Sequence, residues 1–324
     1  MSDFFEEEMF EERPAEPEPE AADEAPARRR ERPARGRGGR KARKRRRGGG
    51  GPKVPKRKRG GGETAKRILV AIPAVAIAIG IIVTPSIVFM LAAIVIGILC
   101  LREYLEMAGS TRPLAIPAYV TVAALVVGAH FGTSYTVLLI FAASFPVLFA
   151  FAADTRHRDG STVSMGVTML GVVWIGIPLA HAVFLRDLPD HGAAILIDVL
   201  VGTFVTDTAA YATGRMFGSH KFAPSLSPNK TVEGLIGGFV IGTMGFWFAG
   251  LYQNWLSGTD ALIMGAAIAA ISPVGDLFES MLKRDLGKKD TGTLFGPHGG
   301  ILDRLDAVLF TVVVGYYLAV ALVY

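Results

Sequence analysis

Long runs of apolar residues, separated by short polar stretches, make up most of the chain after Arg67. An uncharged run of about 20 residues is typical of a helix that crosses a bilayer. We predict such helices at residues 114–131, 134–152, 163–185, 193–213, 232–255, 259–282 and 303–323.

The first apolar run, Ile68–Leu101, is longer than one membrane helix needs to be. Its 34 uncharged residues would form a helix of about 51 Å, whereas the hydrocarbon core measures ~30 Å. Thr84-Pro85-Ser86 near its middle is a typical turn sequence. We therefore predict two short helices here, and about nine transmembrane helices in the whole chain.

Composition supports this fold class. Of the 324 residues 51% are hydrophobic, and the single cysteine, Cys100, lies inside an apolar run. With one cysteine no intrachain disulfide can form, and we expect Cys100 to be a small buried apolar residue. The prediction is an all-α, polytopic integral membrane protein.

Residues 1–67 form a charged tail that differs from the rest of the chain. They hold 21 of the 34 Lys and Arg residues and are acidic over 3–24 and basic over 28–59. Because they have few apolar residues to bury, we predict that they are disordered. The basic part is suited to anionic lipid, or it simply sets orientation as a solvated tail. No aromatic residues interleave with its basic ones, so nucleic acid is not an expected partner.

Basic residues in the predicted loops orient the chain. If the tail is cytoplasmic, 12 of the 13 Lys and Arg residues after Arg67 fall on the cytoplasmic side, and Arg186 alone falls opposite. This bias follows the positive-inside rule. We divide the membrane part into N-terminal helices, 68–190, and a C-terminal part, 191–324, whose cytoplasmic loops carry the candidate chemistry.

Residues 280–306, SMLKRDLGKKDTGTLFGPHGGILDRLD, form a dense polar cluster between two apolar segments. Charges are costly beside hydrocarbon, so such a cluster indicates a functional site. Four cations within seven residues suit phosphates, lipid headgroups or water: Lys283, Arg284, Lys288 and Lys289. Four glycines follow, and they allow backbone amides to approach phosphate oxygens: Gly292, Gly296, Gly299 and Gly300.

Acidic residues lie on both sides of this glycine-rich turn. Asp276 shares a helix face with Glu279, Ser280 and Lys283, and it suits either a metal or a buried ion pair. Glu279 and Lys283 are placed to neutralise each other.

Asp303 and Asp306 have two interpretations. At the start of the last helix they fit the N-cap and N3 positions. Beside phosphate-binding groups they also fit Mg²⁺, which prefers oxygen ligands. His298 has no Cys or second His near it, so we do not expect zinc; it either touches substrate or braces the turn.

A second polar stretch covers residues 207–234. Asp207 lies near the inner end of its helix, and an acid at this depth is typically functional. Tyr211 lies one turn further on, and three polar side chains that could bind substrate follow: Arg215, Ser227 and Lys230. Asp198 lies near the other end of the same helix, where we expect a local structural role.

The two stretches resemble the phosphatidate cytidylyltransferase family. Its signature, S-x-x-K-R-x4-K-D-x-G-x2-L/F-P/G-x-H-G-G-x-x-D-R-x-D, is matched from Ser280 to Asp306. Its D-x-x-A-Y…G-R…G and S-P-x-K-T-x-E-G blocks are similar to 207–218 and 227–234. The chain departs from the pattern at Gly296-Pro297, which inverts the usual order, and at Asn229, where many members carry lysine.

The resemblance implies that the phosphate of phosphatidic acid attacks the α-phosphorus of CTP, which gives CDP-diacylglycerol and pyrophosphate. It implies catalytic roles for Asp207, Lys283, Arg284, Lys289 and Asp303. It implies substrate contacts from Tyr211, Arg215, Ser227, Lys230, Ser280, Lys288, Gly292, His298, Gly299, Gly300 and Arg304. Mg²⁺, with room for a second metal cation, would be held by Asp207, Asp276, Asp290, Asp303 and Asp306.

The resemblance also implies the inner (plasma) membrane as the location and a homodimer as the assembly. Three other functions are alternatives to this transferase. A CTP-dependent polyprenol-type lipid kinase would instead transfer the γ-phosphate. An ion-coupled transporter would spread its acids through the bilayer in two related halves, whereas these gather at one face. A membrane anchor acting through its basic tail would leave the signature unexplained.

Overall fold

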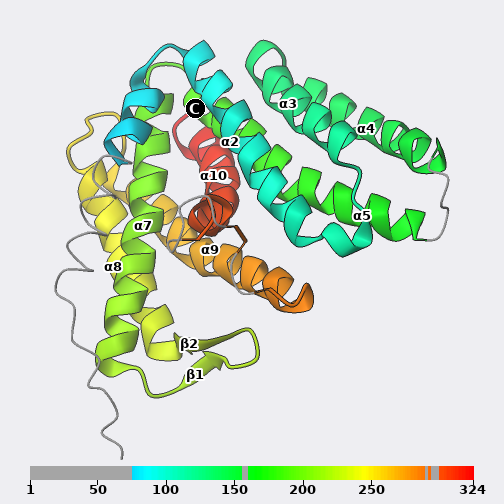
Figure 1. Cartoon of the computed structure of the whole chain (residues 1–324). Helices are drawn as coiled ribbons and strands as arrows, with labels where there is room; N and C mark the ends of the chain where they lie inside the picture. The colour runs from blue at the N-terminus through cyan, green and yellow to red at the C-terminus, as the bar shows by residue number, and fades with distance from the viewer. Residues whose placement is uncertain (1–74, 155–159, 289–290, 293–298) are drawn as a thin grey trace, which may run out of the picture. The chain divides into compact units, whose positions relative to one another are not determined.

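The computed structural model describes residues 75–154, 160–288, 291–292 and 299–324 (Figure 1). The chain divides into two compact units, Met1–Arg59 and Gly60–Tyr324, and all described residues belong to the second unit. The tail, for which we predict disorder, lies outside the described residues. So do residues 68–74, with which the first apolar run begins.

The described part is almost entirely helical. After a helix at residues 75–83 come α2 (Ser86–Met107), η1 (Gly109–Thr111), α3 (Ala115–Phe131) and α4 (Ser134–Asp154). Next is a continuous helix made of α5 (Ser161–Gly171), a π-helical turn η2 (Val172–Gly176) and α6 (Ile177–Arg186). The last four are α7 (Gly192–Phe217), α8 (Val232–Gly250), α9 (Gly258–Asp285) and α10 (Leu302–Leu322).

This order confirms the predicted fold class. Within the described residues, seven helices are long and apolar enough to cross a membrane, and α3 is a shorter apolar helix. The chain turns at Thr84 and Pro85, as predicted. Three boundaries were wrong by four residues or more. The helix predicted at 232–255 ends at Gly250, and the helix predicted at 193–213 continues to Phe217. Helix α2 continues past Leu101 to Met107, so the charges at 102–106 are helical.

Small residues bring α7 and α8 close together. Gly234, Gly238 and Gly242 lie one turn apart on α8. A Cβ atom added at Gly238 would lie 2.8 Å from the Cβ of Ala210 and 3.0 Å from the carbonyl oxygen of Thr206, both on α7. Such rows of small residues allow membrane helices to pack backbone against backbone.

Two clusters of buried apolar side chains stabilise the helix packing. One combines residues of α2 and α3, such as Leu101 and Leu125, with Leu282 of α9 and Leu302 of α10. The other combines α6, α7, α9 and α10. Because α9 and α10 contribute to both clusters, residues from both sides of position 190 share one core.

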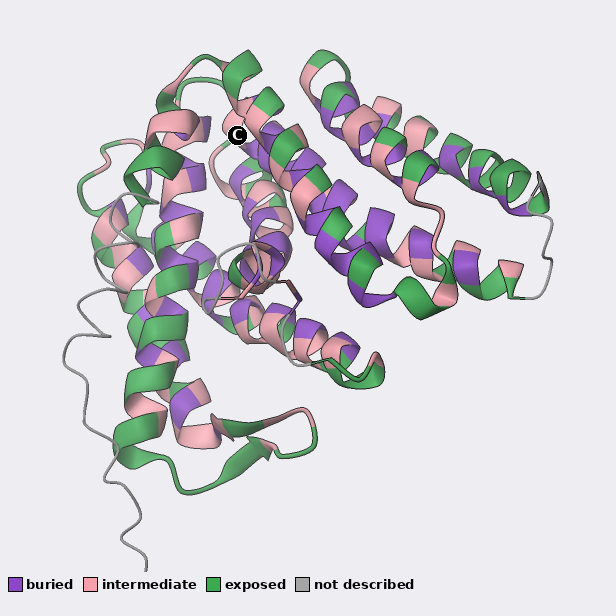
Figure 2. Ribbon diagram, in the orientation of Figure 1, coloured by how far each residue is buried: buried purple, intermediate pink, exposed green. Residues whose placement is uncertain are grey.

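Apolar side chains also cover much of the outside. Figure 2 shows exposed residues along the outer faces of several helices. On α4 and α8 these include Phe145, Phe149, Phe239 and Phe248. A surface of this kind is unfavourable in water but suits contact with lipid tails.

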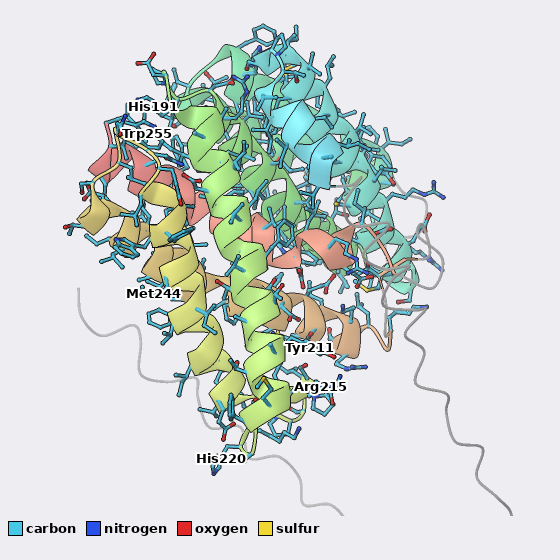
Figure 3. The ribbon with its side chains drawn as sticks, turned by 90° about the vertical axis from the view of Figure 1, so that its left-hand side faces the viewer. His191, Tyr211, Arg215, His220, Met244 and Trp255 are labelled. Carbon is cyan, nitrogen blue, oxygen red and sulfur yellow. The ribbon has the colours of Figure 1, made fainter. Side chains whose placement is uncertain are left out.

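The two ends of the helices carry different polar contacts, with His191 and Trp255 at one end and Tyr211, Arg215 and His220 at the other (Figure 3). At one end, His191 stacks on Trp255 and Asp187 lies 3.0 Å from His130. At the other end lie Tyr211 and a two-stranded antiparallel sheet, β1 (Lys221–Ala223) with β2 (Ser227–Thr231). We call this second end the polar end. The hairpin corrects the sequence analysis, which had treated these residues as a loop.

Candidate functional site

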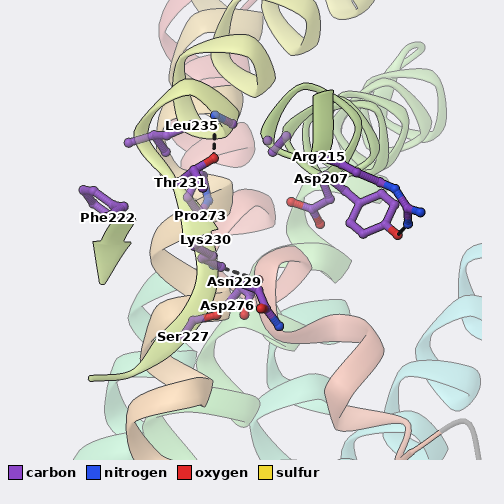
Figure 4. Close-up of a pocket in the computed structure, with 14 residues that line it drawn as sticks. Asp207, Arg215, Phe222, Ser227, Asn229, Lys230, Thr231, Leu235, Pro273 and Asp276 are labelled. Carbon is purple, nitrogen blue, oxygen red and sulfur yellow. Dashed lines mark hydrogen bonds and ion pairs between the residues drawn. The ribbon is translucent and has the colours of Figure 1, made fainter. Parts of the chain in front are cut away.

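A cavity of about 460 Å³ lies at the polar end, between α7, the hairpin, the start of α8 and the middle of α9 (Figure 4). This volume is within the usual range for small-molecule sites. The cavity is lined by Asp207, Ala210, Tyr211, Gly214, Arg215, Phe222, Ser227, Asn229, Lys230, Thr231, Gly234, Leu235, Pro273 and Asp276. Six of these residues were predicted from the sequence as site residues.

Helix α7 supplies one wall of the cavity. Asp207, Tyr211 and Arg215 are spaced four residues apart, so they share one face of the helix. Ser272 of α9 donates a hydrogen bond to Asp207 at 2.8 Å, and Arg215 donates one to the Tyr211 hydroxyl at 2.9 Å. On this wall the Asp207 carboxylate therefore lies deeper in the helix bundle, and the Arg215 guanidinium lies nearer the end of α7.

The hairpin supplies the opposite wall. Lys230 of β2 makes an ion pair with Asp276 of α9 at 2.7 Å, and Asn229 lies beside it (Figure 4). Thr231 caps α8 by accepting a hydrogen bond from the backbone N–H of Gly234. At the hairpin's far end, Arg284 donates to the carbonyl oxygen of Leu226 at 3.4 Å. The hairpin is thus attached both to α8 and to α9.

Negative charge collects around the deep end of the cavity. The carboxylates of Asp276 and Asp207 both repel that of Asp306 on α10. Among the residues that the structure describes, no three His, Cys, Asp or Glu side chains converge into a ready-made metal site. Mg²⁺, however, usually takes one or two carboxylates together with substrate phosphates. Asp207 and Asp276, which line the same cavity, fit that pattern.

Lys283 is the centre of a second polar cluster, which does not line the cavity. Its ammonium group lies 2.5 Å from Glu279 and 2.9 Å from Asp303. The Glu279 residue is 1% exposed, and its Oε1 has no hydrogen-bond partner among the residues that the structure describes. The sequence correctly placed Asp276 and Ser280, and Glu279 and Lys283, on one helix face, since each pair is in contact.

Asp303 also connects the two described ends of the glycine-rich turn. Its carboxylate accepts hydrogen bonds from the backbone N–H groups of Gly300, at 2.7 Å, and Thr291. Gly299 has a φ of 84°, a conformation that glycine adopts easily. Asp303 is not the N-cap, as the helix starts at Leu302 and the N-cap residue Ile301 makes no side-chain cap.

The remaining predicted site residues fall into two groups. Lys288 and Arg304 are exposed beside the turn. Lys289, Asp290 and His298 lie outside the described residues.

Three residues of the polar end were not among the predicted site residues. Phe222 lines the cavity, Ser272 donates a hydrogen bond to Asp207, and Glu103 lies on α2. Ser272 could have been found from its spacing, since it lies one turn before Asp276.

The fold and the site together define a polytopic helical membrane protein with a charged small-molecule site at one end. The chain belongs to the cytidylyltransferase family, whose model matches residues 65–322.

Three relatives, each named phosphatidate cytidylyltransferase, illustrate the similarity. The Thermotoga maritima protein is 37% identical over 179 residues, which is 52% of this chain and 64% of that protein. The Staphylococcus epidermidis protein is 30% identical over 255 residues, 75% of this chain and 94% of that protein. The Haemophilus influenzae protein is 42% identical over 125 residues, 37% of this chain and 43% of that protein.

Proposed function

We propose that the protein transfers the cytidylyl group of CTP to phosphatidic acid, giving CDP-diacylglycerol and pyrophosphate. An oxygen of the lipid phosphate bonds to the α-phosphorus of CTP, and the bond from that phosphorus to the oxygen bridging to the β-phosphate breaks. The single observation that carries the proposal is the cavity, which is lined by two cations, Arg215 and Lys230, and two acids, Asp207 and Asp276, at one end of a set of apolar helices.

The position of this cavity suits one water-soluble and one lipid substrate. The acyl chains of phosphatidic acid would remain beside the apolar helices, while its headgroup would reach the cavity. Arg215 and Lys230 offer donors to phosphate oxygens, and an arginine can do so with two parallel hydrogen bonds. No general base is required, because the attacking phosphate is already an anion.

We propose Mg²⁺ as the cofactor and Asp207 and Asp276 as its first ligands. Bound there together with the nucleotide, it would neutralise charge on the attacking and leaving oxygens. For Asp276 this requires an exchange of partners, since Lys230 now occupies its carboxylate. The freed lysine would then be available to a phosphate. Roles of Asp290, Asp303 and Asp306 as ligands, and of Lys283, Arg284 and Lys289 in holding the triphosphate, remain predictions.

We further propose that the polar end faces the cytoplasm in the inner membrane. The support is the distribution of charge along the sequence, since 12 of the 13 Lys and Arg residues after Arg67 are predicted on the side that carries the polar end and Arg186 on the other. This orientation would also let CTP enter the cavity from the cytoplasm. A homodimer, and binding of the basic tail to anionic lipid, are further parts of the proposal that rest on the resemblance and on composition.

The test is a turnover assay with purified protein, phosphatidic acid, Mg²⁺ and CTP labelled at the α-phosphate. We expect label to enter the lipid phase while pyrophosphate is released. A matched reaction with label at the γ-phosphate should leave the lipid unlabelled. Transfer of the γ-label into lipid would instead establish a lipid kinase, and no turnover with either label would contradict the proposal.

A further inference from the structure

Glu103 lies near the end of α2, far in sequence from every predicted site residue, yet its side chain contacts the start of α10. It is 6% exposed. Its two carboxylate oxygens accept hydrogen bonds from the backbone N–H groups of Ile301, at 3.1 Å, and Leu302, at 2.9 Å. The hydroxyl of Thr291 lies 3.5 Å from the same carboxylate.

These bonds supply what α10 lacks at its first turn. The first N–H groups of a helix have no partner within the helix. A side chain at the N-cap usually accepts from one of them, but Ile301 cannot. Glu103 takes that role from another helix, and its negative charge also suits the positive end of the α10 dipole.

Two glycines of the signature fit closely against the Glu103 carboxylate. A Cβ atom added at Gly292 would lie 2.6 Å from its Oε1, and one added at Gly300 would lie closer still to its Oε2. Side-chain atoms do not approach this closely, so any larger residue at either position would displace the carboxylate. The two glycines therefore flank Glu103 at both described ends of the turn.

Asp303 follows directly after the backbone that Glu103 holds. It lies at the second position of α10 and makes an ion pair with Lys283 of α9. Both residues are predicted catalytic residues. A shift in the first turn of α10 would move the Asp303 carboxylate, and hence the Lys283 ammonium, relative to the rest of the site. Such small displacements can reduce a reaction rate strongly.

We propose that Glu103 is a positioning residue for the transferase reaction: it fixes the first turn of α10 and so places Asp303 and Lys283. The proposal rests on the proposed function, because it assigns Glu103 an effect on that reaction. In this proposal α2, one of the N-terminal helices, contributes to the site indirectly, because Glu103 acts through the first turn of α10.

The experiment replaces Glu103 by Gln. Glu103→Gln preserves size but puts an NH₂ group where a second acceptor is needed, so a donor faces a backbone donor. Glu106→Gln is the matched control, since Glu106 lies one turn further along α2 and pairs with Arg102 at the surface. Turnover and amide hydrogen exchange are measured on both full-length proteins in the same detergent.

For Glu103→Gln we expect kcat to fall at least about 10-fold, as for loss of a supporting hydrogen-bond partner. The KM values for CTP and phosphatidic acid should stay within about threefold, and exchange at Thr291 and residues 300–304 should rise. Glu106→Gln should match the wild type in all of these. If Glu103→Gln does not fold, Gly292→Ala tests the same contact, because its methyl group displaces the carboxylate.

Three results would overturn the proposal. Unchanged exchange would show that Glu103 does not hold the turn. Faster exchange with unchanged kcat would show that holding the turn does not matter for the reaction. If the wild-type protein makes no CDP-diacylglycerol, the proposed function is wrong and the positioning role falls with it. In that case the exchange comparison still decides whether Glu103 orders the start of α10.

Discussion

Asp207 and Asp198 lie on the same helix, α7, but nine residues apart and with different partners. Asp207, in the middle of the helix, lines the cavity and accepts a hydrogen bond from Ser272. Asp198 is buried nearer the start of the helix, where the Gln253 amide donates to it at 2.6 Å. The sequence distinguished the two by depth along the predicted helix. It could not identify Ser272 or Gln253 as their partners, because those contacts depend on how α7 and its neighbours pack.

Asp207→Asn is predicted to reduce kcat by about 100-fold or more, because the site loses a negative charge that would hold the cation against the phosphates. The measurement is the turnover assay with α-labelled CTP, on protein whose folding is verified by its elution from size-exclusion chromatography and its helical circular dichroism.

Asp198→Asn is the matched control on the same helix. It makes the same chemical change at a residue that does not line the cavity, so turnover should stay within about threefold of the wild type. If the Asp198 variant lost as much activity as the Asp207 variant, a general effect on α7 would explain both results. The assignment of Asp207 to the site would then be wrong.

At the scale of elements, apolar runs were sufficient to predict every α-helix of the described part, whereas the short 3₁₀ helix η1 was not predicted. The hairpin was missed for a physical reason. Its strands have three and five residues, and β2, Ser-Pro-Asn-Lys-Thr, has no alternation of apolar and polar positions. Its register depends instead on contacts with α8 and α9, which the sequence does not display.

The close packing of α7 on α8 depends on glycine at position 238. Gly238→Ala would force a methyl group against the backbone of Thr206 and Ala210, so we expect a loss of about 1–3 kcal/mol. For a chain of this size that corresponds to a fall in Tm of several degrees, about 2–4 °C per kcal/mol. Thermal unfolding in detergent, followed by circular dichroism, measures it.

Gly166→Ala on α5 is the control for that change. A Cβ atom added there meets nothing within 4 Å, and alanine favours helix more than glycine does, so Tm should be unchanged or slightly higher. Equal destabilisation by both variants would mean that helix geometry, and not contact between α7 and α8, explains the requirement for glycine.

At the scale of the whole molecule, the sequence predicted which loops share a side. Contacts in the structure agree with that grouping, as Lys230 meets Asp276 at one end and His191 meets Trp255 at the other. Glu103 escaped prediction because it follows Arg102 at the end of an apolar run, where both looked like ordinary loop charges. Its partners lie almost 200 positions later, beyond the reach of any local pattern.

The proposed orientation predicts where an added cysteine can react. Ser219→Cys at the polar end should react with a membrane-impermeant maleimide only after cells are permeabilised. Asn254→Cys at the opposite end should react in intact cells. The native Cys100 is fully buried and can stay in place, so the unmodified protein is the control for background labelling. The reverse pattern would mean that the polar end faces away from the cytoplasm.

The contact between α2 and α10 has a consequence for biosynthesis. Glu103 leaves the ribosome with the second helix, whereas the amide of Leu302 emerges 199 residues later. At about 5–20 residues per second, a nascent chain waits roughly 10–40 s before that glutamate meets its backbone hydrogen-bond donors. During this interval an acidic side chain stands at the lipid boundary without compensation. A chain that stalls before α10 is made would therefore leave the Glu103 carboxylate without its backbone donors. Such an unpaired charge would distinguish incomplete chains for membrane proteases and chaperones.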